Sequence, residues 1–166
     1  MEKTNLVLIG MPGAGKSTAG VLLAKKTALK FLDTDVLIQA AQNRMLQEII
    51  DQDGYLELRR IERDVILTVT ERHCVIATGG SAAYHAETMK HLKKDGKIIF
   101  LDVRLETLYR RVKDFGTRGI AKRLDQTFED VFQERKKLYE LYADITIDAN
   151  DLTMEDVARV IMMKIA

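Results

Sequence analysis

Residues 10–17 read Gly-Met-Pro-Gly-Ala-Gly-Lys-Ser, and this stretch decides the fold. It fits the pattern G-x-x-x-x-G-K-[ST], which requires a strand before it and a helix after it. An apolar run, Leu-Val-Leu-Ile at 6–9, precedes the pattern, and a stretch with helical character follows it over 17–27. With glycine near 7% of average usage, a chance match somewhere in such a chain has a probability of roughly 1% or less. The stretch therefore predicts a strand, a phosphate-binding loop and a helix in succession.

Outside this loop, short apolar runs alternate with stretches of helical periodicity. We read the runs at 6–9, 30–32, 74–77, 97–101 and 145–147 as strands. Helices are expected over 17–27, 55–70, 128–142 and from 154, where Thr153 is a candidate N-cap. Continuous apolar runs are typical of parallel strands covered on both faces. The alternation predicts an α/β fold of three layers, an open five-stranded parallel sheet flanked by helices, with ligands at the carboxyl ends of the strands.

Length and composition limit the possible classes of protein. The 166 residues suit one domain, 1–166, without a linker. The 26 Lys+Arg and 25 Asp+Glu give a net charge of +1, which argues against nucleic-acid binding by bulk charge. One cysteine excludes an intrachain disulfide, and three scattered histidines do not build a zinc site. The apolar run at 6–9 is too short for a signal peptide or a membrane span. We expect a cytoplasmic monomer that binds neither nucleic acid nor a membrane.

The phosphate-binding loop predicts a nucleoside triphosphate ligand. Backbone N–H groups of the glycine-rich stretch would turn inward around the phosphates, and the start of the following helix adds its positive end. Lys16 would reach the β- and γ-phosphates, and the Ser17 hydroxyl would coordinate Mg²⁺. The alternative is a glycine-rich turn with a surface lysine. The residues expected to bind ATP in this loop are Gly13, Ala14, Gly15, Lys16, Ser17 and Thr18.

Two carboxylates follow the run at 30–32, in the order Asp33-Thr-Asp35. If Asp33 faces the metal, Asp35 projects toward a different part of the same cleft. A carboxylate in that place could accept a proton from an attacking hydroxyl or orient it. The alternative for either residue is a helix cap, because aspartate is a favoured N-cap.

Two arginines are candidates for binding an anionic substrate. Arg135 falls on the apolar stripe of the helix expected over 128–142, and a charge on a buried face needs a partner or a ligand. Its guanidinium suits a carboxylate, although an internal salt bridge to Glu62 is the alternative. Arg59 is a weaker candidate from spacing alone, because Arg59, Arg60 and Arg63 could form a solvated basic face.

Glycines mark two further candidate sites. Gly79 and Gly80 follow the run at 74–77, where residues without a Cβ permit close backbone approach to a ligand; a plain tight turn is the alternative. Residues 112–123, which we call the lid segment, contain two glycines and lie outside any clear stripe. They predict a mobile lid whose Arg118 stabilises charge on a transferring phosphoryl group, or otherwise a basic surface loop.

Taken together, these motifs resemble the shikimate kinases, small P-loop kinases that phosphorylate a hydroxyl of a cyclic carboxylic acid. The likeness covers essentially the whole chain. The family's D-[ST]-D element appears at 33–35, its G-E-x-x-F-R-x-x-E stretch at 54–62, its glycine triplet at 79–81 and its R-x-P-L-Y segment at 135–139. The resemblance implies the P-loop NTPase fold, with Mg²⁺ bound by Ser17 and Asp33 and with ATP as co-substrate.

The resemblance also implies roles for individual residues. Asp35 would bind and activate the hydroxyl, Arg59 and Arg135 would clamp the carboxylate, and the Gly79–Gly80 backbone would contact the substrate. Lys16, Asp35 and Arg118 are then the catalytic residues. Arg118 would close over the phosphates, and Arg110 lies where family members often place an arginine over the adenine. These residues predict an ATP-dependent kinase whose acceptor is a small carboxylic acid, with shikimate as the leading choice.

The chain departs from the family pattern at three positions. Gly119 follows the lid arginine in place of proline, Ser81 replaces the third glycine of the triplet, and Lys137 replaces the proline before Leu-Tyr. None of these removes a charged group assigned to the chemistry, but pocket walls and lid decide which acid is accepted. Two alternatives therefore stay open: a kinase for another acceptor, such as gluconate or a nucleoside monophosphate, and a nucleotide-dependent regulatory module.

Overall fold

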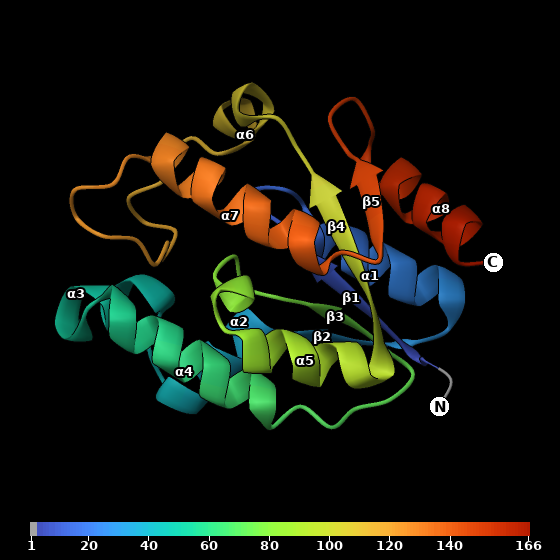
Figure 1. The fold of residues 1–166 in the computed structure, drawn as a ribbon, viewed down its shortest axis with the longest axis horizontal. Coiled ribbons are helices and arrows are strands. Elements are labelled where there is room, and N and C mark those ends of the chain that lie inside the picture. The colour runs from blue at the N-terminus through green and yellow to red at the C-terminus, as the bar shows by residue number, and fades with distance from the viewer. Residues whose placement is uncertain (1–2) are drawn as a thin grey trace.

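A parallel sheet forms the centre of the structure, a computed structural model that describes residues 3–166 (Figure 1). Its strands are β1 (Asn5–Ile9), β2 (Lys30–Asp33), β3 (Cys74–Ala77), β4 (Gly96–Asp102) and β5 (Ile145–Asp148). They pair in the order β2-β3-β1-β4-β5, and every pair is parallel. All residues of β1 and β3 are buried, which explains their unbroken apolar runs. The five predicted strands and the predicted sheet are confirmed.

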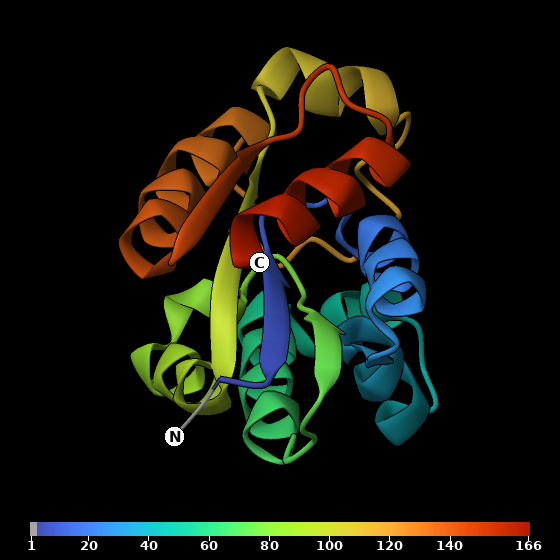
Figure 2. The same cartoon turned by 90° about the vertical axis from the view of Figure 1, so that its right-hand side faces the viewer.

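Helices cover both faces of this sheet. They are α1 (Lys16–Thr27), α2 (Thr34–Gln42), α3 (Leu46–Asp53), α4 (Tyr55–Leu67), α5 (Ala86–Asp95), α6 (Leu105–Arg111), α7 (Phe128–Tyr142) and α8 (Met154–Ile165), with a short 3₁₀ turn, η1 (Ala82–Tyr84). In Figure 2, α1 and α8 lie on one side of the sheet, and α5 and α7 lie on the other. The result is the predicted three-layer arrangement.

The predicted helix boundaries hold with one correction. Thr153 caps α8 as expected, because its side chain accepts a hydrogen bond from the Asp156 amide. The helix expected over 55–70 ends at Leu67 instead. The amide of Thr68 bonds back to Val65 in a tighter turn, which closes the helix early.

A second, smaller apolar cluster lies apart from the main core and forms one wall of the functional site. It is built from α2, α3, α4 and the lid segment, and its buried members are Ile38, Ile49, Leu58, Ile61 and Ala121. The lid segment joins α6 to α7 and lies over α3 (Figure 1). There the Gly119 amide donates to the Gln47 side chain at 3.1 Å.

Gly119 occupies a position that only glycine fits well. Its φ is +63°, and a Cβ at this position would lie 2.4 Å from the Cβ of Leu46. This departure from the family pattern therefore has a local cause, the close packing of the lid segment on α3. Within residues 3–166, no helix combines the length and the apolar character needed to cross a membrane.

Candidate active site

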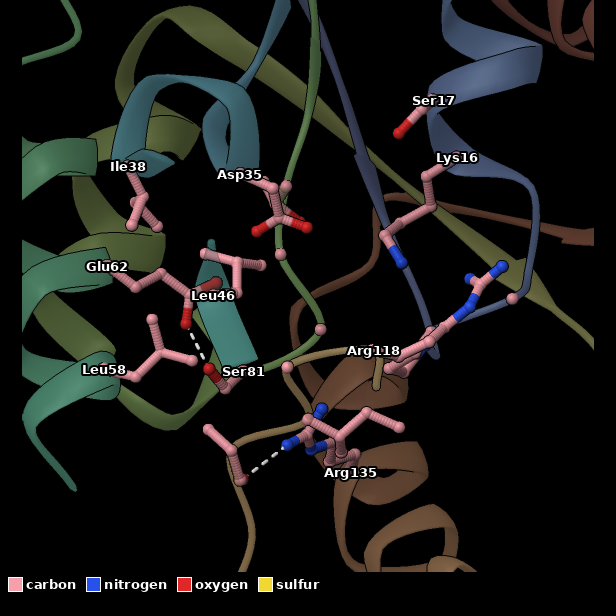
Figure 3. A pocket seen from close by; sticks show the side chains of 18 of the residues that line it. Lys16, Ser17, Asp35, Ile38, Leu46, Leu58, Glu62, Ser81, Arg118 and Arg135 are labelled. Atoms are coloured by element: carbon pink, nitrogen blue, oxygen red, sulfur yellow. Dashed lines mark hydrogen bonds between the residues drawn. The ribbon is translucent and has the colours of Figure 1, made fainter. Parts of the chain in front are cut away.

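The carboxyl ends of the strands open into one cavity of about 420 Å³ (Figure 3). Segments far apart in the chain line it. The predicted site residues among them are Gly13, Gly15, Lys16, Ser17, Thr18, Asp35, Gly79, Gly80, Arg118 and Arg135. Side chains that the sequence analysis assigned to donor and acceptor binding thus face the same space.

The loop between β1 and α1 has the shape that its sequence predicts. Gly13 and Gly15 have φ of +85° and +95°, a conformation that favours glycine. Gly15 precedes α1 and supplies no side-chain cap, so the first amides of that helix are open to an anion. Ala14, also expected to bind ATP, is buried and is not among the residues that line the cavity.

Lys16 is held against the loop itself. Its Nζ donates to the carbonyl oxygens of Gly10 at 2.8 Å and Met11 at 2.9 Å. Burial lowers the pKa of this ammonium to about 8, against the opposing effect of the Asp35 carboxylate. The ammonium is therefore poorly solvated and faces the cavity, where an anionic ligand would stabilise it.

Asp33 contacts both the phosphate-binding loop and the helix that follows it. One carboxylate oxygen accepts from the Asp35 amide at 2.9 Å and caps α2, and the other accepts from the Ser17 hydroxyl. Of the two aspartates that could cap the helix, Asp33 is therefore the N-cap of α2. Asp35 does not cap the helix, and it lines the cavity.

The pair Ser17 and Asp33 fits Mg²⁺ by the chemistry of its atoms. Both offer oxygen, the ligand that Mg²⁺ prefers, and the ion usually takes one or two protein ligands together with waters and phosphate oxygens. In the described chain, 3–166, no group of three or more His, Cys, Asp or Glu side chains could hold a metal alone. A metal at this point would therefore depend on the nucleotide phosphates for part of its coordination.

Asp35 projects from the start of α2 into the cavity, facing Lys16 (Figure 3). Burial raises the pKa of its carboxyl above the usual range, while the positive charge of Lys16 acts in the opposite direction. The aspartate is therefore a carboxylate with increased affinity for a proton, as a general base requires.

Glu62 and Ser81 are a buried pair in the same cavity that the sequence analysis did not place among the site residues. Glu62, in α4, is 3% exposed, and the Ser81 hydroxyl donates to its carboxylate. Burial and the neighbouring Asp35 raise the pKa of Glu62 to about 7. Both residues fall in the stretches that carry the family resemblance, but only the fold brings α4 against the turn η1 that Ser81 precedes.

Gly79 and Gly80 are crowded by the side chains of the cavity. A Cβ on Gly79 would lie 2.1 Å from a Glu62 oxygen and 2.7 Å from an Asp35 oxygen. A Cβ on Gly80 would lie 2.7 Å from a nitrogen of Arg135. Charged side chains that line the site fill the space beside these glycines, and the expected contact of their backbone with a ligand stays a prediction.

Arg135 and Arg59 meet inside the protein. Arg135 is 1% exposed, and its Nη2 donates to the Ala121 carbonyl oxygen at 2.8 Å. Arg59 Nη2 donates to the same oxygen at 3.0 Å. The Nε of each arginine is buried and has no hydrogen-bond partner within the described residues. The two guanidinium groups thus lie next to each other. Arg135 lines the cavity, whereas Arg59 is not among its lining residues.

The structure also decides between the alternatives considered for these arginines. Arg59 turns inward, with its guanidinium 3.8 Å from the ring centre of Tyr84, while Arg60 stays exposed and pairs with Glu57. The solvated basic face that was the alternative for Arg59 therefore does not include this residue. Among the described residues, the internal salt bridge from Arg135 to Glu62 is not formed.

Arg110, expected over the adenine of ATP, is exposed on α6 and donates to the Thr107 hydroxyl. It is not among the residues that line this cavity, whereas the next residue, Arg111, is. Arg111 donates to the carbonyl oxygens of Ala14 at 3.3 Å and Ala149 at 2.8 Å. The direction in which α6 packs decides between adjacent arginines, and spacing carries no signal for it. Lys137 does not line the cavity, so this departure from the family pattern leaves the acceptor pocket unchanged.

A nucleotide-binding loop that shares one cavity with an acidic residue and a buried arginine defines a class of protein, the P-loop kinases. In these enzymes the loop holds the donor phosphates while separate groups hold the acceptor.

Comparison with known proteins identifies the family. The family described as Shikimate kinase matches residues 12–166. Shikimate kinases from Sulfurihydrogenibium sp. (strain YO3AOP1) and Thermodesulfovibrio yellowstonii are 35% and 37% identical, covering 97% and 95% of this chain and 97% and 92% of theirs. The chain belongs to the shikimate kinase family and is a phosphotransferase of that kind.

Solved structures agree with this assignment. Shikimate kinase from Acinetobacter baumannii in complex with shikimate superposes with a TM-score of 0.90 at 29% identity, covering 98% of this chain and 92% of that one. The enzyme from Aquifex aeolicus gives a TM-score of 0.83 at 30% identity, over 97% of this chain and 95% of that one. The predicted fold and family are confirmed.

Proposed function

We propose that this chain transfers the γ-phosphoryl group of ATP to a hydroxyl of shikimate and forms shikimate 3-phosphate, a step of aromatic amino acid biosynthesis. The observation that carries the proposal is the meeting of Lys16, Asp35 and Arg135 in one cavity. A lysine for the donor phosphates, a base for a hydroxyl and an arginine for a carboxylate are the three groups that this reaction needs.

In this proposal, ATP binds along the loop 10–18 with its phosphates at the start of α1. The first amides of the helix and the Lys16 ammonium neutralise the phosphate charge, and Lys16 exchanges its loop carbonyl partners for phosphate oxygens. Ser17 and Asp33 would hold Mg²⁺, which when bound neutralises charge on the phosphate oxygens. Arg111 is the better candidate than Arg110 for a contact with the nucleotide, because Arg111 lines the cavity.

Asp35 removes the proton of the acceptor hydroxyl in this scheme. The oxygen forms a bond to the γ-phosphorus, the bond from that phosphorus to the β–γ bridging oxygen breaks, and ADP leaves with the electron pair. The proton moves to the Asp35 carboxylate, whose raised pKa favours that transfer. Lys16 and Arg118 stabilise the charge that spreads over the transferring group.

The acceptor carboxylate would bind at the arginine edge of the cavity. Arg135 supplies a buried guanidinium there. Arg59, which donates to the same Ala121 carbonyl oxygen, supplies a second guanidinium next to it. A guanidinium fork binds carboxylate oxygens in pairs, which orients the acid as well as holding it. The backbone of Gly79 and Gly80, which both line the cavity, would then contact the acid.

The test is an ADP-release assay with Mg·ATP and three candidate acceptors: shikimate, gluconate and CMP. We expect ADP release that depends on shikimate, with little response to gluconate or CMP. Turnover with CMP would favour a nucleoside monophosphate kinase, since arginines also bind phosphate. Slow ATP hydrolysis, at a rate that none of the three acceptors changes, would favour a regulatory module and overturn the proposal.

We also propose that the chain works in the cytoplasm as a monomer with one kinase domain, 1–166. One chain supplies the groups proposed to bind both the donor and the acceptor, so the proposed reaction requires no second copy. Size-exclusion chromatography with light scattering would test the assembly state. We expect the molar mass of one chain, whereas twice that mass at every concentration would show a stable dimer.

A further inference from the structure

Ser81 stands on the acceptor side of the cavity, where the family pattern has a third glycine. It is 5% exposed, and its hydroxyl points at Glu62 (Figure 3). The hydrogen bond from Ser81 to Glu62 joins the start of η1 to α4. A glycine at position 81 would leave that carboxylate oxygen buried without this donor, at a cost in free energy.

The hydrogen bond determines where the other oxygen of Glu62 lies. Ser81 donates to Oε2, and Oε1 lies 2.1 Å from the point that a Cβ on Gly79 would occupy. An oxygen of Asp35 lies 2.7 Å from the same point. Two carboxylate oxygens from different helices are therefore neighbours on one wall, above a backbone that has no side chain.

We propose that Ser81 is a positioning residue that holds the Glu62 carboxylate beside Asp35, so that the pair accepts hydrogen bonds from two adjacent hydroxyls of the acceptor. This inference rests on the proposed function. Neighbouring carboxylates repel each other, and the Ser81 hydroxyl keeps Glu62 in place against that repulsion. Asp35 would take the hydroxyl that is phosphorylated, and Glu62 the hydroxyl next to it. The pocket then selects cyclic acids that carry a vicinal diol.

The charges around Glu62 suit this role. Lys16 at the start of α1 and Arg135 in α7 favour its anionic form, while Asp35 in α2 and burial oppose it. The Ser81 hydrogen bond also favours the anion, and together these groups leave the pKa of Glu62 at about 7. Removal of the Ser81 hydroxyl would raise that pKa further, so that less carboxylate is present at neutral pH.

The experiment compares shikimate with an analogue that lacks the hydroxyl adjacent to the phosphorylated one. For the native chain, we expect kcat/KM to fall at least tenfold with the analogue. For Ser81→Ala, we expect kcat/KM for shikimate to fall toward the analogue's value, so that the ratio between the two acceptors approaches one. The acid limb of the kcat/KM profile for shikimate should also move to higher pH in this variant.

Thr88→Val is the matched control, because Thr88 lies on α5, is not among the residues that line the cavity, and has a buried hydroxyl without a hydrogen-bond partner among residues 3–166. It should keep the native ratio between the two acceptors. Ser81→Gly restores the family residue and removes the same hydroxyl, so it takes the place of Ser81→Ala if the alanine variant does not fold. Equal losses for both acceptors in these variants, with an unmoved acid limb, would overturn the role of Ser81. An absence of shikimate turnover in the native chain would instead overturn the proposed function itself.

Discussion

The guanidinium groups of Arg59 and Arg135 donate to one and the same atom, the carbonyl oxygen of Ala121, at 3.0 and 2.8 Å. Arg59 comes from α4, Arg135 from α7, and Ala121 from the lid segment between α6 and α7. A peptide oxygen carries only a partial negative charge, and both Nε groups remain unpaired within the described residues. The two cations are therefore incompletely balanced by the protein, and a carboxylate would stabilise them better.

Replacement of Arg59 tests the carboxylate clamp. Arg59→Ala should raise KM for shikimate by about one to two powers of ten, because a charge-assisted hydrogen bond contributes roughly 1.5–3 kcal/mol. KM for ATP should change little. Steady-state kinetics would measure both constants, and Arg72→Ala, at an exposed arginine that pairs with Asp95, is the control. Equal changes in the two variants would contradict the clamp.

Asp35→Asn tests the general base. The amide keeps the shape of the side chain but cannot take a proton, so kcat should fall by about 10²- to 10⁴-fold. The affinity for ATP should stay near the native value, since Asp33 rather than Asp35 contacts the phosphate-binding loop. Fluorescence titration with a nucleotide analogue would measure that affinity. An unchanged kcat would remove Asp35 from the chemistry.

Arg118→Ala tests the contribution of the lid segment to phosphoryl transfer. Arg118 lines the cavity, and an arginine that stabilises a transferring phosphoryl group contributes about 10³-fold or more to kcat. We expect a loss of that order in kcat, with a smaller effect on KM for shikimate. Arg123→Ala is the matched control in the same segment, because Arg123 is exposed and pairs with Asp125. Similar kinetics for the two variants would identify the segment as a surface loop.

Removal of the metal tests the site at Ser17 and Asp33. EDTA should abolish shikimate-dependent ADP release, and added Mg²⁺ should restore it. Ser17→Ala should raise the Mg²⁺ concentration for half-maximal rate by about tenfold or more, a loss typical of disturbed metal sites. Thr27→Ala is the control, since this hydroxyl lies at the far end of α1 and bonds the Leu23 carbonyl. Full turnover in EDTA would exclude the metal site.

Glu62→Gln tests the buried carboxyl through the pH dependence of stability. The pKa of Glu62 is about 7 in the folded chain and near 4.5 when exposed, so its stabilising contribution is complete below pH 4.5 and lost as the pH rises through 7. From pH 5 to pH 8 this loss is at most about 3 kcal/mol in the free energy of unfolding. The glutamine variant should therefore gain stability relative to the native chain as the pH rises. Urea unfolding at both pH values would measure this, and parallel curves would refute the buried, shifted carboxyl.

The phosphate-binding loop, the parallel sheet and the residues of the donor site could be predicted because their signals are local. A glycine-rich loop of this pattern between a strand and a helix is typical of a phosphate-binding loop. An unbroken apolar run such as β1 is typical of a parallel strand that is buried on both faces. Arg135 could be recognised in the same way, since its charge interrupts the apolar stripe of a single helix. In each case a few neighbouring residues contain the whole physical reason.

The arrangement of the acceptor side depended on contacts between segments far apart in the chain. The packing direction of α6 turned Arg111 rather than Arg110 to the cavity, and the packing of α4 turned Arg59 inward while Arg60 stayed in solvent. The pairing of Ser81 with Glu62 needs α4 to meet the turn η1, which Ser81 precedes. Periodicity assigns a residue to a helix face, but the fold decides which face meets which neighbour, because only packing brings distant charges within hydrogen-bond distance.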